Sequence, residues 1–106
     1  MSIKRMLEDL KSVKVALNDF LEESKKIIQK HGGVLLNSEP CVVEDDWLIS
    51  MFYFKENTEI QFIFTCINET ENKFYAITSE NSNCPPFLIA MANQMYQRIS
   101  GTNTIH

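Results

Sequence analysis

Side chains able to act as nucleophiles or soft metal ligands are few and widely spaced in this chain. The cysteines are Cys41, Cys66 and Cys84, and the histidines are His31 and His106. No two cysteines form a CxxC pair, and neither histidine stands at a ligand spacing from a cysteine, so the pattern predicts no zinc site and no disulfide framework. We expect three reduced thiols that pack as small apolar side chains.

Other chemistry-bearing patterns are incomplete. The run Glu44-Asp45-Asp46 lacks the spaced ligands and the glycine of a calcium loop, which favours a solvated acidic corner. Cys84 precedes Pro85 at a helix start, where a thiolate would be stabilised, but no histidine is placed to serve it. The sequence therefore predicts no catalytic residue, no cofactor and no metal, and we expect that the chain is not an enzyme.

Length and composition indicate a folded protein of one domain, residues 1–106, with 102–106 as a loose tail. Hydrophobic residues make up 44% and charged residues 23%, which excludes a disordered chain. No segment approaches the ~20 consecutive apolar residues of a membrane helix. The N-terminus lacks the apolar block and cleavage site of a signal peptide, so we predict a cytoplasmic protein that does not bind membranes.

Charge is unevenly distributed along the chain. Residues 2–31 hold seven bases and five acids, whereas residues 32–82 hold two bases and nine acids. Nucleic acid is an unsuitable partner for this acidic region, because phosphate contacts need clustered Lys and Arg. A partner protein with a basic surface fits better, although acidic loops that only maintain solubility would give the same pattern.

The pattern of apolar residues predicts an α+β fold in two layers. Apolar residues at alternating steps of three and four predict one long helix from Ile3 to Lys30, ended by Gly32-Gly33. A short C-terminal helix opens at Pro85-Pro86 and ends at Ser100-Gly101. Between them we expect an antiparallel sheet of about four strands, built from a short strand at 34–37 and a meander of 47–54, 58–67 and 73–79. Residues 41–43 could pair as a further brief strand or form a connector.

The meander is too apolar for a sheet with one wet face. Hairpins centred on Glu56 and Thr70 place these residues on the core face: Leu48, Phe52, Phe54, Ile60, Phe62, Phe64, Cys66, Phe74 and Ala76. The opposite face then collects Trp47, Ile49, Met51, Tyr53, Ile63, Tyr75 and Ile77. Either a helix covers each face, which would give three layers, or the second face contacts another protein.

We interpret the second face as a protein-binding surface. Its predicted residues are Trp47, Ile49, Met51, Ile63, Tyr75 and Ile77, with Glu44, Asp45 and Asp46 as an acidic rim. The hypothesis is an inhibitor, an immunity protein or an antagonist that occludes a partner protein, and the same face could form a homodimer. The alternatives are a homodimeric secretion-type chaperone that holds an unfolded client, and a sensor that binds a small molecule between sheet and helix.

Overall fold

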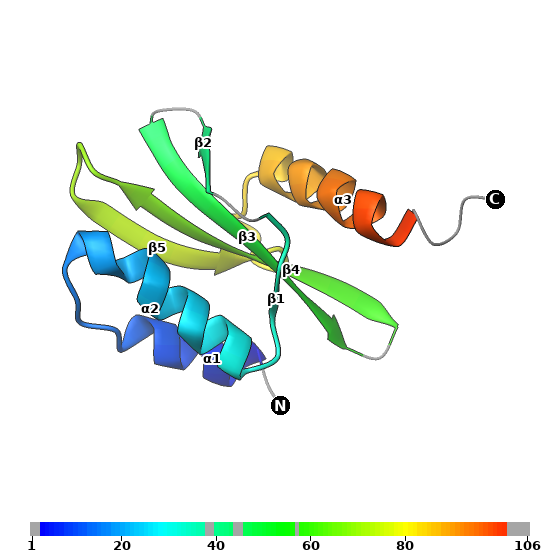
Figure 1. Cartoon of the computed structure of the whole chain (residues 1–106), viewed down its shortest axis with the longest axis horizontal. Helices are drawn as coiled ribbons and strands as arrows, with labels where there is room; N and C mark the ends of the chain where they lie inside the picture. Colours follow the sequence, from blue (N-terminus) through cyan, green and yellow to red (C-terminus); the bar gives the residue numbers. More distant parts are fainter. Residues whose placement is uncertain (1–2, 38–39, 44–45, 57, 102–106) are drawn as a thin grey trace.

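A computed structural model describes residues 3–37, 40–43, 46–56 and 58–101, and in this part the chain forms three helices and five strands. The helices are α1 (Ile3–Lys11), α2 (Leu17–Lys30) and α3 (Pro86–Gly101). The strands are β1 (Val34–Leu35), β2 (Cys41–Val43), β3 (Trp47–Glu56), β4 (Glu59–Asn68) and β5 (Lys73–Thr78). The α+β class is therefore confirmed, and the sheet has five strands where about four were predicted, because residues 41–43 pair as a strand (Figure 1). The predicted tail, residues 102–106, lies outside the described residues.

All strand pairs in the sheet are antiparallel, and β3, β4 and β5 form the predicted meander. The two short strands β1 and β2 both pair with the same side of β3, one beside each half of that strand. The strand order is β1-β3-β4-β5, so β5 forms the other edge of the sheet. This arrangement gives the sheet one long continuous edge and one edge built from two short pieces.

The prediction of one long N-terminal helix is wrong. The chain leaves the helix after Lys11 and re-enters it at Leu17, and α2 folds back beside α1. The Nε2 atom of His31 lies 2.7 Å from the Oδ2 atom of Asp9. These residues are 22 positions apart in the sequence, so in one straight helix their backbones would be about 33 Å apart. Val13 and Val15 in the connector are β-branched and disfavour helix, whereas the spacing of apolar residues continues through the break.

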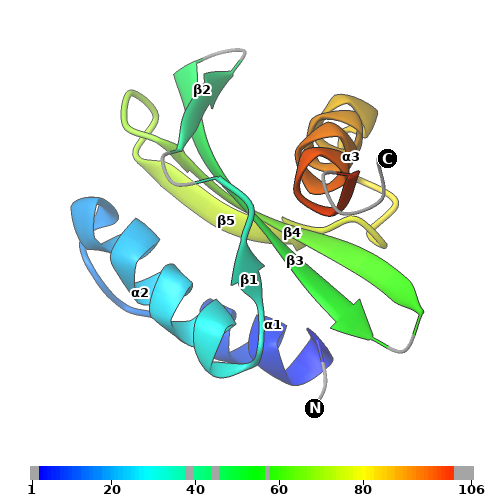
Figure 2. The same cartoon turned by 45° about the vertical axis from the view of Figure 1, so that its right-hand side comes forward.

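Helices cover both faces of the sheet, which makes three layers in place of the predicted two. Figure 2 shows the α1–α2 pair on one side of the sheet and α3 on the other. On the α3 face, Leu88 and Ala92 pack in one buried cluster with Met51 and Phe64. On the helix-pair face, Met6, Leu10 and Ile28 pack with Phe52, Phe54 and Ile63. The apolar excess in the meander is thus largely used inside the protein, to bury two cores.

The predicted register placed the middle strand, β4, with the wrong side towards each core. The structure pairs Phe52 with Ile63 and Glu56 with Glu59, a shift of three residues from the predicted hairpin. The second hairpin pairs Ile63 with Thr78, a shift of one. A shift by an odd number of residues turns a strand's side chains to the other face of the sheet. The first shift therefore exchanges the two faces of β4 relative to β3, and the second returns β5 to the faces that were predicted for it. The apolar side chains of β4 exchange faces: Ile63 lies on the helix-pair face, and Phe62, Phe64 and Cys66 lie on the α3 face.

Candidate functional site

The residues predicted to bind a partner divide into a group inside the protein and a group near its surface. Ile49 and Met51 are buried beneath α3, and Ile63 is fully buried on the opposite face beneath the helix pair. These three cannot touch a partner while the monomer stays folded. Trp47 and Ile77 are partly buried at the margin of the α3-face core, and Tyr75 is 41% exposed.

The predicted acidic rim is described only at Asp46. Glu44 and Asp45 lie outside the described residues. Asp46 is exposed, and its φ of 62° puts it in the left-handed region, which aspartate tolerates better than most residues. This turn leads directly into β3, so the carboxylate stands at one end of the sheet.

Trp47 and Tyr75 form an aromatic pair that spans β4. Their ring centroids are 5.3 Å apart with an interplanar angle of 70°, an edge-to-face arrangement that is favourable for aromatic rings. Cys66, which pairs with Tyr75 across β4 and β5, is fully buried. Burial raises the pKa of the Cys66 thiol from 9.0 to about 12, although a hydrogen bond from Tyr75 opposes that effect. Burial also raises the pKa of Tyr75 to about 12, and interactions with Cys66 add to it.

Cys84 does not have the stabilised thiolate that its position before a helix suggested. Its side chain is buried in the α3-face core, and this burial raises its thiol pKa. The sulfur lies 3.9 Å from the carbonyl oxygen of Pro85, a contact that favours the protonated thiol. Cys66 and Cys84 are therefore thiols of low reactivity, since the thiolate is the nucleophilic form.

An apolar row crosses the sheet on the helix-pair face, at the end where β3 starts. The register aligns Val42 with Leu48, Leu48 with Ile67, and Ile67 with Phe74, on four neighbouring strands. The ring of Phe20 from α2 covers the β5 end of this row, with its centroid 4.3 Å from that of Phe74. The β2 end is open, and Val42 is 70% exposed.

Two carboxylates border the open end of that row. A hollow of about 290 Å³, here called the acidic hollow, is lined by Val42, Asp46, Leu48, Ile67, Glu69 and Thr70. Asp46 stands two residues before Leu48, and Glu69 stands two residues after Ile67. Leu48 and Ile67 form the last pair of the β3–β4 register, and both carboxylates lie just beyond it, on the rim of the same hollow. Within the described part of the chain, neither has a basic side chain as a salt-bridge partner.

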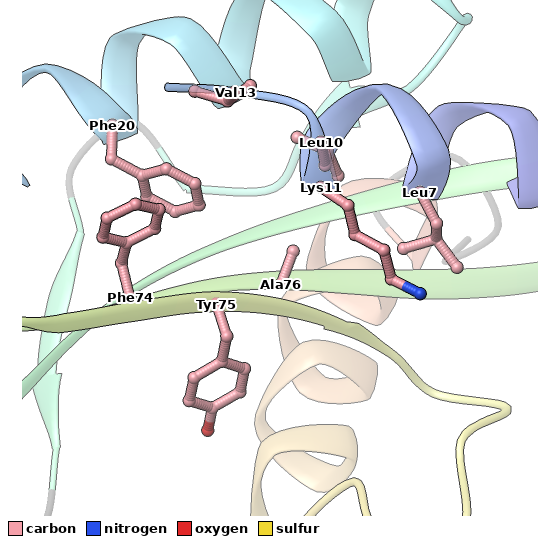
Figure 3. Close-up of a pocket in the computed structure, with 8 residues that line it drawn as sticks. All are labelled: Leu7, Leu10, Lys11, Val13, Phe20, Phe74, Tyr75 and Ala76. Carbon is pink, nitrogen blue, oxygen red and sulfur yellow. The ribbon is translucent and has the colours of Figure 1, made fainter. Parts of the chain in front are cut away.

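A second hollow, of about 250 Å³, lies between the helix pair and β5 (Figure 3). Apolar side chains from α1, α2 and β5 form most of it, and Lys11 supplies a single amine. Phe20 and Phe74 face each other at one end, and the ring of Tyr75 points to the opposite side of β5. This hollow has the position that a small-molecule sensor would require, between sheet and helix.

Asp9 and His31 are an acid–imidazole pair that the sequence did not indicate. A catalytic role requires a nucleophile or an ordered water at the second ring nitrogen. Ser12, the nearest hydroxyl in sequence, donates to the backbone oxygen of Asp9 at 2.8 Å and not to the imidazole. The contact joins α1 to the residue that follows α2. In the described part of the chain, no group of three His, Cys, Asp or Glu side chains is arranged to hold a metal ion.

Comparison with known proteins adds no assignment, because no family model, no curated protein and no solved structure matches this chain. Among the described residues, no helix is long and apolar enough to span a membrane. The acidic hollow is thus assigned from geometry alone. Sequence reasoning found its Asp46 but missed Val42, Leu48, Ile67 and Glu69, because they share a site only through the strand register.

Proposed function

We propose that this chain acts in the cytoplasm by binding another protein, as an inhibitor, an immunity protein or an antagonist, and that it does so without a cofactor or catalysis. The observation that carries the proposal is the acidic hollow, where apolar side chains and two carboxylates line one open site. Two carboxylates that share a site repel each other when no basic group lies between them. We therefore expect a cationic group to bind between Asp46 and Glu69 in the acidic hollow.

The partner that fits this surface carries a Lys or Arg beside an apolar side chain. The apolar group would cover Val42 and Leu48, and the cation would lie between Asp46 and Glu69. Desolvated apolar contact would slow dissociation, whereas the carboxylates would accelerate encounter with a basic surface. Trp47 and Tyr75 lie on the opposite face of the same sheet, so we expect them to extend the interface around the sheet end.

The test uses the chain as bait in an extract of the cells that make it. Three baits are compared: the wild type, the variant Asp46→Asn/Glu69→Gln, and the variant Glu8→Gln/Glu22→Gln, which loses the same charge from the exposed side of the helices. The proposal predicts a discrete protein that the wild type and the helix variant retain and the hollow variant loses. Retention of the same proteins by all three baits would contradict it.

A small-molecule sensor is the second candidate, and the hollow between the helix pair and β5 favours it. Its apolar lining and the amine of Lys11 suit a small apolar carboxylate. Decanoate should then raise the melting temperature more than decanol does, and Lys11→Met should abolish the difference. The homodimeric chaperone has less support, because helices occupy both sheet faces along which a client would be held.

A further inference from the structure

The outer side of β5 presents unpaired backbone groups. In an antiparallel pair, successive residues alternate between facing the partner strand and facing away from it. The amide of Ser79 donates to the carbonyl oxygen of Phe62 at 2.9 Å, so Ile77, Tyr75 and Lys73 also face β4. Phe74 and Ala76 therefore point their N–H and C=O groups outwards, where no described residue bonds to them.

β5 lacks the features that usually protect the edge of a sheet. Natural edges are kept short or carry charges, prolines or bulges. The opposite edge follows this rule, since β1 has two residues and β2 has three. β5 runs for six residues without proline or glycine, and Lys73 at its start is its one charged residue. Phe74 and Tyr75 are 36% and 41% exposed on its two faces. A strand of this kind is suited to pairing with another strand.

We propose that β5 pairs antiparallel with β5 of a second copy of this chain, about a two-fold axis at Ala76. The axis must set outward-facing residues of one copy against outward-facing residues of the other, and it brings the residue on which it falls against its own copy, so a charged or bulky side chain would be unfavourable there. Ala76 meets both conditions. The same register sets Phe74 of one copy opposite Thr78 of the other, and two five-stranded sheets become continuous. The N–H of Thr78 can donate to Phe74 of the other copy, whereas the Thr78 carbonyl oxygen already accepts a hydrogen bond from the N–H of Asn81 at 3.1 Å.

Side chains along this seam are complementary. Tyr75 of one copy lies opposite Ile77 of the other, which covers the exposed phenol ring with an aliphatic side chain. Lys73 stands opposite Ser79 and one residue from Glu80, and symmetry repeats this ion pair at the other end of the seam. Lys73 and Glu80 are both exposed in the monomer and have opposite charges. There Lys73 lies 3.5 Å from Glu71, and Glu80 accepts a hydrogen bond from Gln61 at 2.6 Å, so the seam would exchange these exposed contacts for the pair across it. This charge arrangement favours a second copy over a strand of unrelated sequence, and the proposal does not rest on the function proposed for the acidic hollow.

The first experiment measures the dimer dissociation constant of the purified chain by sedimentation equilibrium. Lys73→Glu and Glu80→Lys, made singly, each put like charges together at both ends of the seam, and each should weaken the dimer about tenfold. The double variant Lys73→Glu/Glu80→Lys restores opposite charges and should restore the wild-type constant. A wild-type chain that stays monomeric at high micromolar concentration overturns the proposal. A double variant no stronger than the singles also overturns it.

The second experiment removes one outward backbone donor. Ala76→Pro deletes an N–H that faces away from β4, so the sheet keeps its internal hydrogen bonds and circular dichroism should show a folded monomer. Val42→Pro is the matched control, because Val42 is an exposed residue that alternates outwards on the opposite edge. It should leave the dimer intact. Equal dimerisation of the folded Ala76→Pro chain and the wild type would show that the copies meet elsewhere and would overturn the proposal.

Discussion

The indole ring of Trp47 and the phenol ring of Tyr75 meet edge to face at 5.3 Å, although they belong to strands that β4 separates. Cys66, the β4 residue paired with Tyr75, is buried and keeps its proton, because burial raises its pKa from 9.0 to about 12. The aromatic pair therefore helps to enclose a neutral thiol. It remains a prediction that the same pair contacts a partner.

This enclosure makes stability sensitive to alkali. Between pH 9.0 and about 12, the unfolded chain releases the Cys66 proton while the folded chain retains it. The unfolded state then binds fewer protons, so the free energy of unfolding falls as pH rises through this range. Denaturant unfolding at a series of pH values measures the slope. Cys66→Ala should start from a lower stability and show a shallower decline, and an unchanged slope in this variant would contradict the assignment.

Replacing Ile63 by Lys should unfold the protein. Ile63 is fully buried on the helix-pair face among Phe52, Phe54 and Ile28. A buried cation there should cost about 4 kcal/mol or more. Val42→Lys is the control, since Val42 is 70% exposed and should tolerate the charge. Circular dichroism and denaturant unfolding compare the two, and cooperative unfolding of Ile63→Lys at the wild-type midpoint would count against the observed register.

The contact between Asp9 and His31 should stabilise the packing of α1 on α2. Asp9→Asn weakens a hydrogen bond of 2.7 Å that joins residues from the two helices. The carboxylate is 48% exposed, so we expect a modest loss of about 1 kcal/mol. Glu8→Gln changes the neighbouring exposed carboxylate and should have almost no effect. Chemical denaturation distinguishes them, and equal losses in the two variants would argue against the contact.

Thr65 offers a substitution that should stabilise the protein. Its side chain is fully buried, and its hydroxyl has no hydrogen-bond partner among the described residues. Thr65→Val keeps the shape and removes the desolvated hydroxyl, which should add about 1 kcal/mol to the free energy of unfolding. Thr65→Ala serves as the comparison, because it also leaves a cavity and should destabilise. If thermal unfolding shows that Thr65→Val loses as much stability as Thr65→Ala, the hydroxyl has a partner in solution.

The strands and the last helix could be predicted because their apolar runs end at polar turns and at Pro85-Pro86. The register of β4 could not, since Phe62 to Ile67 offer side chains suited to burial on both faces. A pattern without alternation does not specify which side faces a given core. The polar segment before Glu59 is compatible with a two-residue or a three-residue turn. Only the packing of the two cores decides which turn, and therefore which register, the hairpin adopts.

The break in the N-terminal helix was hidden for a related reason. Val13 continues the apolar spacing of α1, and the sequence between Lys11 and Leu17 has neither proline nor glycine. The preference for covering one broad sheet face with two short helices is a tertiary effect, and the β-branched Val13 and Val15 weaken the helix there without specifying the break. The acidic hollow depends on the same level of structure, because Asp46 and Glu69 are 23 positions apart and line one hollow only through strand pairing.

The association rate with the protein captured by the bait experiment tests the central claim most directly. Stopped-flow mixing at low and at high salt would compare Asp46→Asn/Glu69→Gln with the charge-matched control Glu8→Gln/Glu22→Gln. If the acidic hollow receives a basic side chain, the hollow variant associates more slowly at low salt and loses most of its salt dependence, while the control keeps the wild-type rate. Equal association rates for the hollow variant and the control at low salt would contradict the account.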